Sequence, residues 1–135
     1  MDSGIQLFSP LVKLQVEKNM KKKEKNGMFY LEKTIEISAS HKLELDYGSK
    51  CQRLHGHNFK VKIYCKSPTL GRNGMVVDFE IIKELVSTLD HSDLNHFILQ
   101  PTSENIAKYV WKLVPRCYKV DVIESEGNKV TYEGE

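Results

Sequence analysis

Cys51-Gln-Arg-Leu-His55-Gly-His57-Asn-Phe59 is the stretch of this chain that reveals most about its fold. An alternating row of apolar residues continues from it, namely Phe59, Val61 and Ile63. Such alternation predicts a β-strand over residues 55–65. Since alternate residues of a strand share one face, His55 and His57 should stand on the face of the apolar row, with Cβ atoms about 7 Å apart. Two imidazoles at that spacing can bind one metal ion.

A third histidine has matching parity in the segment that precedes this strand. Residues 29–41 carry apolar side chains at odd positions, namely Phe29, Leu31, Ile35, Ile37 and Ala39. If residues 29–41 and 55–65 pair as an antiparallel hairpin, His41 arrives beside His55 and His57. Three histidines without a fourth protein ligand are the pattern of a catalytic zinc site with an open position. The alternative is that each is an ordinary core or surface histidine, and three on matching faces favour the metal.

Length, composition and charge limit the classes of protein to which the chain can belong. Its 135 residues are 40% hydrophobic, which is enough for one domain with its own core. The net charge of +2 is too small to indicate a nucleic-acid or membrane partner, and no apolar run approaches membrane-spanning length. Three cysteines, and a start without a basic run, favour a cytoplasmic protein over a secreted disulfide scaffold.

Residues 1–27 differ in composition from the rest of the chain. The run from Lys18 to Gly27 is charged and of low complexity, which indicates a flexible N-terminal extension. A faint apolar face leaves a docked arm as the alternative; its members are Leu7, Phe8, Leu11, Val12 and Leu14. The sequence therefore predicts one domain over residues 28–135.

Further elements follow from turn and capping signals. The pattern predicts a helix over residues 79–89 with Asp78 as N-cap, and a second helix after Pro101 with Thr102 or Ser103 as cap. Strands over 117–124 and 129–133 form a second hairpin. The order ββααββ predicts an α+β fold in which a four-stranded, mainly antiparallel sheet carries two helices on one face.

Two further groups are suited to proton transfer. Cys51 lies in a loop beside the histidines, where a cation would make its thiolate available. In the pair Asp90-His91, the carboxylate can orient the imidazole for general acid–base work. The alternatives are an inert loop thiol for Cys51, and a helix cap followed by a solvated histidine for Asp90-His91.

Glu124 is the remaining candidate for ligand binding. It continues the parity of Tyr118, Val120 and Val122 in the strand 117–124. A carboxylate on an otherwise apolar face needs partners, and its two oxygens suit a guanidine-like pair of N–H groups. The alternative is that the strand has already ended and Glu124 is solvated.

Five motifs follow one another along the chain: Ser38-Ala-Ser-His41, Cys51-x3-His55-Gly-His57-Asn58, Leu89-Asp-His91-x2-Leu94-Asn95, Pro101-Thr-Ser-Glu104-Asn, and Glu124 with Tyr132-Glu-Gly-Glu135. As a set they resemble the 6-pyruvoyl tetrahydropterin synthase family over nearly all of residues 29–135. The three-residue gap between Cys51 and His55, and the Tyr132-Glu-Gly-Glu ending, look more like the 6-carboxy-tetrahydropterin synthase branch of the queuosine pathway.

The resemblance implies a fold, an assembly and a role for each candidate residue. The fold is the tunnelling fold, whose sheets join side by side into a barrel of trimers that stack as a homohexamer. Exposed sheet edges favour closure on physical grounds as well. The implied roles are zinc ligation by His41, His55 and His57, catalysis by Cys51 with Asp90 and His91 from across a subunit boundary, and pterin binding by Glu124 with Thr102 and Ser103 nearby.

The resemblance also implies a substrate. This is 7,8-dihydroneopterin triphosphate, and the branch's products are 6-carboxy-tetrahydropterin, acetaldehyde and triphosphate, formed by a zinc-dependent lyase. Three alternatives remain open, namely a biopterin-type 6-pyruvoyl synthase, a three-histidine zinc hydrolase, and a non-catalytic zinc- or pterin-binding module. The hydrolase has no need of Cys51, Asp90-His91 and Glu124 together.

Overall fold

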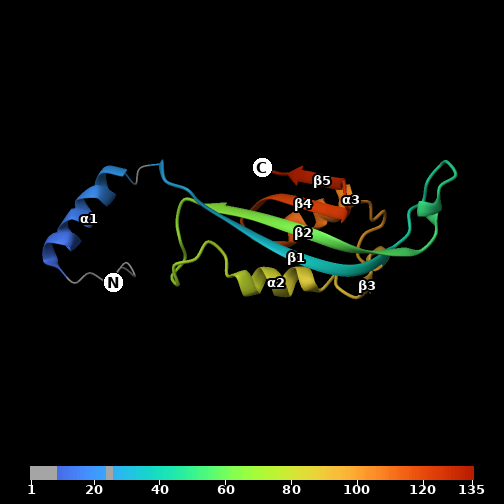
Figure 1. Ribbon diagram of the computed structural model, residues 1–135, viewed down its shortest axis with the longest axis horizontal. Helices are drawn as coiled ribbons and strands as arrows, with labels where there is room; N and C mark the ends of the chain where they lie inside the picture. The colour runs from blue at the N-terminus through green and yellow to red at the C-terminus, as the bar shows by residue number, and fades with distance from the viewer. Residues whose placement is uncertain (1–8, 24–25) are drawn as a thin grey trace.

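A long antiparallel hairpin forms the centre of the sheet (Figure 1). In the computed structural model, which describes residues 9–23 and 26–135, β1 (Phe29–His41) pairs with β2 (His55–Ser67) along its whole length. The register places Ile37 opposite Phe59 and His41 opposite His55. This confirms the predicted hairpin and brings the histidine-bearing ends of both strands together.

Two further strands lie beyond β2 and one short strand lies beyond β1. β4 (Cys117–Ser125) and β5 (Asn128–Glu133) form the predicted second hairpin, and the sheet order is β3-β1-β2-β4-β5. β3 (Ser92–Asp93) pairs in parallel with Ala39 and Ser40 of β1. The prediction of four strands was therefore wrong by one, because a two-residue strand is too short to leave a periodic pattern.

Two helices cover one face of the sheet. α2 (Phe79–Ser87) begins at its predicted cap Asp78, which accepts a hydrogen bond from the Glu80 amide at 2.9 Å. α3 (Ser103–Leu113) begins at Thr102, whose Oγ1 accepts from the Asn105 amide at 3.2 Å. α2 lies against β1, and α3 lies against β4 and β5. Both helices contribute to one buried core with the inward rows of β1, β2 and β4.

A β-bulge changes the parity at the start of β4. The register shifts between Tyr64 and Cys65 of β2, where Lys119 and Cys117 are the respective partners. Tyr118 is the extra residue, and its ring contacts the rings of Tyr30 and Tyr64 on the face away from the helices. The expected inward position of Tyr118 was therefore wrong, because a bulge inserts one residue and reverses the alternation.

The N-terminal extension contains a helix, α1 (Pro10–Lys23). Its apolar side chains are largely exposed, with Leu11 at 77%, and Figure 1 shows it beyond the Phe29 end of the hairpin. Leu7 and Phe8 of the suggested apolar face lie outside the described residues. Flexibility of residues 1–27, and the domain boundary at residue 28, stay predictions. Among the described residues, every helix is too short or too polar to cross a membrane.

Candidate metal centre and active site

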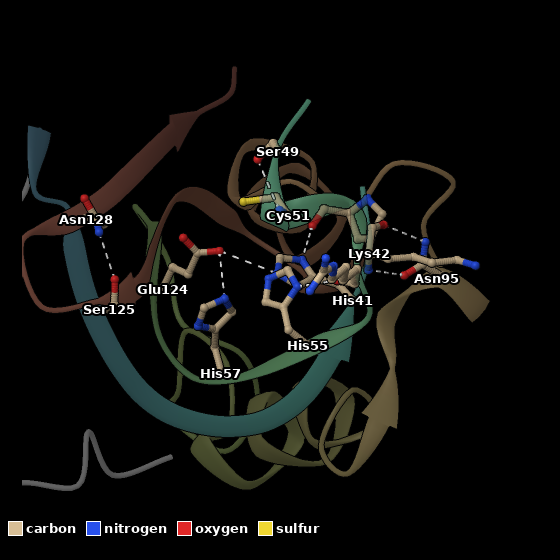
Figure 2. A network of polar contacts seen from close by, with 12 residues as sticks. His41, Lys42, Ser49, Cys51, His55, His57, Asn95, Glu124, Ser125 and Asn128 are labelled. Atoms are coloured by element: carbon tan, nitrogen blue, oxygen red, sulfur yellow. Dashed lines mark hydrogen bonds and ion pairs between the residues drawn. The ribbon is translucent and has the colours of Figure 1, made fainter. Parts of the chain in front are cut away.

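Three histidines and one glutamate converge where the central hairpin ends (Figure 2). His41 comes from the end of β1, His55 and His57 from the start of β2, and Glu124 from β4. Each offers one ligand atom, and all four atoms lie within 4.8 Å of one another. The strand parity and the hairpin register together produce this cluster, as the sequence predicted for the three histidines.

Backbone carbonyls fix the orientation of two of the imidazoles. Nδ1 of His41 lies 2.7 Å from the carbonyl oxygen of Pro101, and Nδ1 of His55 lies 2.6 Å from that of Arg53. Because a carbonyl oxygen only accepts, each Nδ1 carries the proton and each Nε2 keeps its lone pair. A hydrogen bond from the second ring nitrogen to a carbonyl is the usual support of a metal-bound histidine.

The Nε2 atom of His41 provides the strongest indication of a bound cation. The His41 side chain is 1% exposed, and its Nε2 has no hydrogen-bond partner. A buried polar atom without a partner costs free energy, which a metal bond would recover. At His57, burial lowers the pKa of the imidazole against the raising effect of Glu124, with His41 and His55 adding to the lowering. The neutral ring is the form that ligates a metal, so these donors fit zinc.

Glu124 lies beside two of the histidines, a proximity that the sequence did not predict. Its Oε1 lies 3.3 Å from Nε2 of His57 and 3.5 Å from Nε2 of His41. The carboxylate therefore faces the cluster, which removes the alternative of a solvated residue beyond the strand end. At this position it can either complete the metal's coordination or bind the N–H groups of a ligand beside the metal. The parity of β4 indicated the inward direction, but only the β2–β4 register brings Glu124 to His57.

Cys51 lies in the loop between β1 and β2, within the short 3₁₀ helix η2 (Lys50–Gln52). The Ser49 hydroxyl accepts from the Cys51 amide at 3.1 Å, and the Cys51 carbonyl accepts from the Leu43 amide at 3.0 Å. The second bond ties this loop to the chain two residues after His41. The thiol is half-buried, and Figure 2 shows it on the side of the cluster that Glu124 occupies.

Asp90 and His91 are held at the outer edge of β1. The Asp90 carboxylate accepts from the Ser38 amide at 2.8 Å, and the His91 amide donates to the Ser38 carbonyl. The same carboxylate lies 3.1 Å from Nδ1 of His91, whose ring is 82% exposed. The Ser38 amide is the largest cause that lowers the pKa of Asp90, and His91 adds to it. An ionised Asp90 can therefore orient the exposed imidazole for proton transfer.

The N-terminus of α3 is also brought to the cluster. Pro101, whose carbonyl accepts from His41, directly precedes Thr102 and Ser103. Two side-chain amides for which the sequence predicted no role, those of Asn95 and Gln100, hold the neighbouring backbone in place. Asn95 makes two hydrogen bonds with the backbone of Lys42, at 2.9 and 3.0 Å (Figure 2). Gln100 does the same with Glu44, at 3.0 and 2.7 Å.

An open cavity of about 640 Å³ lies beside the outer edge of β1. It is lined by residues of β1 and β2, by both residues of β3 and by the residue before β3: Ser38, Ala39, Ser40, Gly56, His57, Asn58, His91, Ser92 and Asp93. His57 and His91 thus border one space, whereas Cys51 and Glu124 are outside its lining among the described residues. The cavity has room for a ligand between His57 and His91, whereas Cys51 and Glu124 lie elsewhere in a single chain.

The comparison with known proteins agrees with the geometry of this site. The family model described as 6-pyruvoyl tetrahydropterin synthase matches residues 30–135. The chain belongs to the 6-pyruvoyl tetrahydropterin synthase family. Its members named among the relatives are tetrahydropterin synthases, so the family is one of pterin-forming enzymes.

The relatives match different shares of this chain. The 6-carboxy-5,6,7,8-tetrahydropterin synthase of Synechocystis is 35% identical over 114 residues, which cover 73% of this chain and 88% of that protein. A relative from Pyrococcus abyssi is 47% identical over 58 residues, but the alignment spans 43% of this chain and 36% of the relative. The structure of Caenorhabditis elegans 6-pyruvoyl tetrahydropterin synthase superposes with a TM-score of 0.65 and 26% identity, covering 81% of this chain and 97% of that one.

Proposed function

We propose that this protein is a zinc-dependent 6-carboxy-tetrahydropterin synthase that acts in queuosine biosynthesis, in the cytoplasm. It converts 7,8-dihydroneopterin triphosphate and water into 6-carboxy-5,6,7,8-tetrahydropterin, acetaldehyde and triphosphate. The observation that carries the proposal is the convergence of His41, His55 and His57 in a member of this family, with the buried Nε2 atom of His41 making no hydrogen bond. The identity with the Synechocystis protein supports the 6-carboxy branch.

His41, His55 and His57 would hold the zinc ion, and hydrogen bonds from the second ring nitrogen fix the direction of two of these rings. The carbonyls of Pro101 and Arg53 keep the rings of His41 and His55 from rotating. Bound zinc supplies a Lewis acid that polarises and acidifies the side-chain hydroxyl groups of the substrate. The buried side of the cluster, where His41 packs against the ring of Phe59, excludes water from that end of the site.

Proton transfer to and from the substrate's side-chain carbons falls to Cys51, Asp90 and His91. The Cys51 thiol accepts a proton from carbon; the hydrogen bond from the Leu43 amide to the Cys51 carbonyl, which ties its loop to the chain two residues after His41, supports this role. Asp90 holds Nδ1 of His91, so the opposite nitrogen of that ring is free to exchange a proton. Asp90 acts as a positioning residue here, since its carboxylate is occupied by the Ser38 amide and the imidazole.

Glu124 and the start of α3 bind the pterin ring. A carboxylate with two free oxygen directions can accept two parallel N–H groups from the ring, as it does from a guanidinium group. Thr102 and Ser103 follow Pro101 and therefore lie beside the same end of the cluster. The 3.3 Å distance between Glu124 and His57 supports this role, because a pterin ring bound by Glu124 would lie next to the metal with its reactive side chain within reach.

The active form is a closed homo-oligomer, a hexamer of two stacked trimers, in which neighbouring chains complete each site. In the described residues, β3 pairs only with Ala39 and Ser40, and Asp90 and His91 bind the backbone of Ser38, so the outer edge of β1 before Ser38 has no strand partner. β5 is the opposite edge of the sheet and pairs only with β4. Pairing of the two edges in adjacent chains removes both, and the exposed ring of His91 then reaches a neighbour's Cys51.

A second candidate is a synthase that forms 6-pyruvoyl-tetrahydropterin, and the structural similarity to the Caenorhabditis elegans enzyme favours it. The two candidate enzymes act on the same substrate and form different products. Incubation of the purified protein with 7,8-dihydroneopterin triphosphate under reducing conditions, followed by mass spectrometry, separates them. We expect 6-carboxy-tetrahydropterin with an equal amount of acetaldehyde. A pyruvoyl product without acetaldehyde would establish the second candidate, and unchanged substrate would indicate a binding module.

A further inference from the structure

Two cysteines stand directly opposite each other at the far end of the sheet from the histidine cluster. Cys65 of β2 and Cys117 of β4 are register partners across adjacent antiparallel strands. Both are free thiols. Cys65 is eight residues beyond His57 on the same strand, which separates the two positions by about 26 Å. This pair is therefore distinct from the site described above, and the proposed function makes no use of it.

The hydrogen bonds around the pair identify its geometry. The Lys66 amide donates to the Arg116 carbonyl at 3.2 Å, which links the residue after Cys65 to the residue before Cys117. Bonds between flanking residues mark Cys65 and Cys117 as a non-hydrogen-bonded pair, in which Cα atoms lie about 4.5 Å apart. Disulfides span Cα separations of about 4.4–6.8 Å, so the separation typical of such a pair lies within the range that a disulfide can bridge.

The local backbone can also accommodate the small movement that a disulfide requires. Cys117 is the first residue of β4, and the bulge at Tyr118 follows it directly. Arg116 before it has a left-handed conformation, with φ of 60°. Its guanidinium group donates to the Val76 carbonyl at 3.3 Å, which anchors the turn. Irregular backbone on both sides of Cys117 lets its side chain approach Cys65 without disturbing the central pairing of β2.

The two thiols differ in access and in acidity. Cys65 is fully buried, whereas Cys117 is half-buried. The neighbouring Cys65 thiol is the main cause that lowers the pKa of Cys117, while the same contact and burial raise the pKa of Cys65. In the dithiol form, Cys117 Sγ donates to the Lys119 carbonyl at 3.4 Å. Cys117 is thus the more exposed and the more acidic of the two thiols, so a reagent reaches it first, and Cys65 is placed to react second.

We propose that Cys65 and Cys117 form a reversible dithiol–disulfide couple that is oxidised by low-molecular-weight organic disulfides. The Cys117 thiolate attacks one sulfur of the organic disulfide, which forms a mixed disulfide and releases one organic thiolate. Cys65 then loses its proton to that thiolate and attacks Cys117 Sγ, and the second organic thiolate leaves and is protonated by solvent. Two electrons pass from the cysteine pair to the reagent, which ends as two thiols.

The consequence is a cross-link that closes the chain between residues 65 and 117. This segment contains α2, β3, α3 and the Asp90-His91 pair. A bond across it restricts the unfolded chain and should raise the thermal unfolding midpoint by on the order of 5–10 °C. Metal binding should not change, since the histidine cluster lies at the other end of β2.

The test is titration of the folded, full-length protein with glutathione disulfide, followed by peptide mapping without reduction. We expect one internal link between the peptides that contain Cys65 and Cys117, with a mass loss of about two hydrogens. Dithiothreitol should reverse the link and the rise in the thermal midpoint. The Cys65→Ser variant should stop at a stable mixed disulfide on Cys117, and the Cys117→Ser variant should leave Cys65 unmodified.

Three results would overturn the proposal. The first is a wild-type protein that keeps a stable mixed disulfide on Cys117 without forming the link. The second is a link that forms only in denaturant, which would mean that the folded geometry forbids it. The third is a chain in which only Cys51 reacts while Cys65 and Cys117 remain reduced. A Cys51→Ser variant serves as the matched control, because it removes the third thiol and should still form the internal link.

Discussion

Oε1 of Glu124 lies 3.3 Å from Nε2 of His57, so the carboxylate from β4 contacts an imidazole of the candidate metal centre. This contact allows two roles for Glu124, as a fourth metal ligand or as the anchor of the pterin ring. The proposed open position on the metal requires the second role, because a catalytic zinc keeps one site for substrate.

Glu124→Gln distinguishes these roles. The substitution keeps the shape of the side chain and removes its charge. If Glu124 anchors the pterin, the variant should retain its zinc and bind a pterin product analogue more weakly by roughly 1.5–3 kcal/mol, the worth of a charged hydrogen bond. Calorimetric titration and metal analysis of the same sample measure both quantities. Loss of zinc together with unchanged pterin affinity would assign Glu124 to the metal instead.

Cys51→Ala should abolish most turnover without loss of the metal. We expect the rate to fall by about 10² or more, which is the usual contribution of a general acid–base group, while zinc content and the thermal midpoint stay near wild type. Cys117→Ala is the matched control, because it removes a half-buried thiol that lies outside the site, in β4. If the Cys51 variant keeps activity within a few-fold of the control, the thiol takes no part in the reaction.

Mixing two inactive variants tests whether neighbouring chains complete a site. Cys51→Ala and His91→Ala should each be inactive alone, and reassembly of the two after dissociation should restore part of the activity. Cys51→Ala mixed with His57→Ala should restore none, since both positions belong to the same half of the site. Light scattering reports the assembly in parallel. A fully active monomer at working concentration would contradict the shared site.

The pH dependence of stability should report on Tyr64. Its hydroxyl donates to Asp121 at 2.8 Å, and burial together with this bond raises the pKa of Tyr64 to about 12. The folded state therefore holds the proton more tightly than the unfolded chain, whose tyrosines titrate near 10. This contribution is complete below pH 10 and is lost as pH rises through about 12.

Urea unfolding at a series of alkaline pH values measures this effect. Tyr64→Phe should remove part of the decline between pH 10 and 12, because the variant has no phenol to titrate at that position. Tyr47→Phe, which changes an exposed loop tyrosine, should follow the wild type. Equal slopes for the wild type and the Tyr64 variant would mean that this hydroxyl does not contribute.

The sequence predicts the central hairpin and the three histidines because both depend on strand alternation alone. One parity rule places His41, His55 and His57 on a common face, and side-chain capping signals at Asp78 and Thr102 locate the helix starts. Strand alternation and helix capping depend on residues that are close together in the chain, so a single sequence is enough to recognise them.

The features that the sequence did not predict depend on contacts between distant segments. β3 has two residues and exists because Ser92 and Asp93 pair with β1. The bulge that turns Tyr118 outward depends on the register of β4 against β2. The side-chain amide of Asn95 makes two hydrogen bonds with the backbone of Lys42, which lies 53 residues earlier in the chain. No local sequence pattern indicates a contact of this kind.

The metal content of the purified protein tests the central claim most directly. We predict about one zinc per chain after purification without chelator, bound by His41, His55 and His57. His57→Ala should lose most of this zinc, while His96→Ala, which changes an exposed histidine outside the cluster, should keep it. Full zinc retention by the His57 variant, or a wild-type protein that binds no zinc when it is supplied, would contradict the metal centre proposed here.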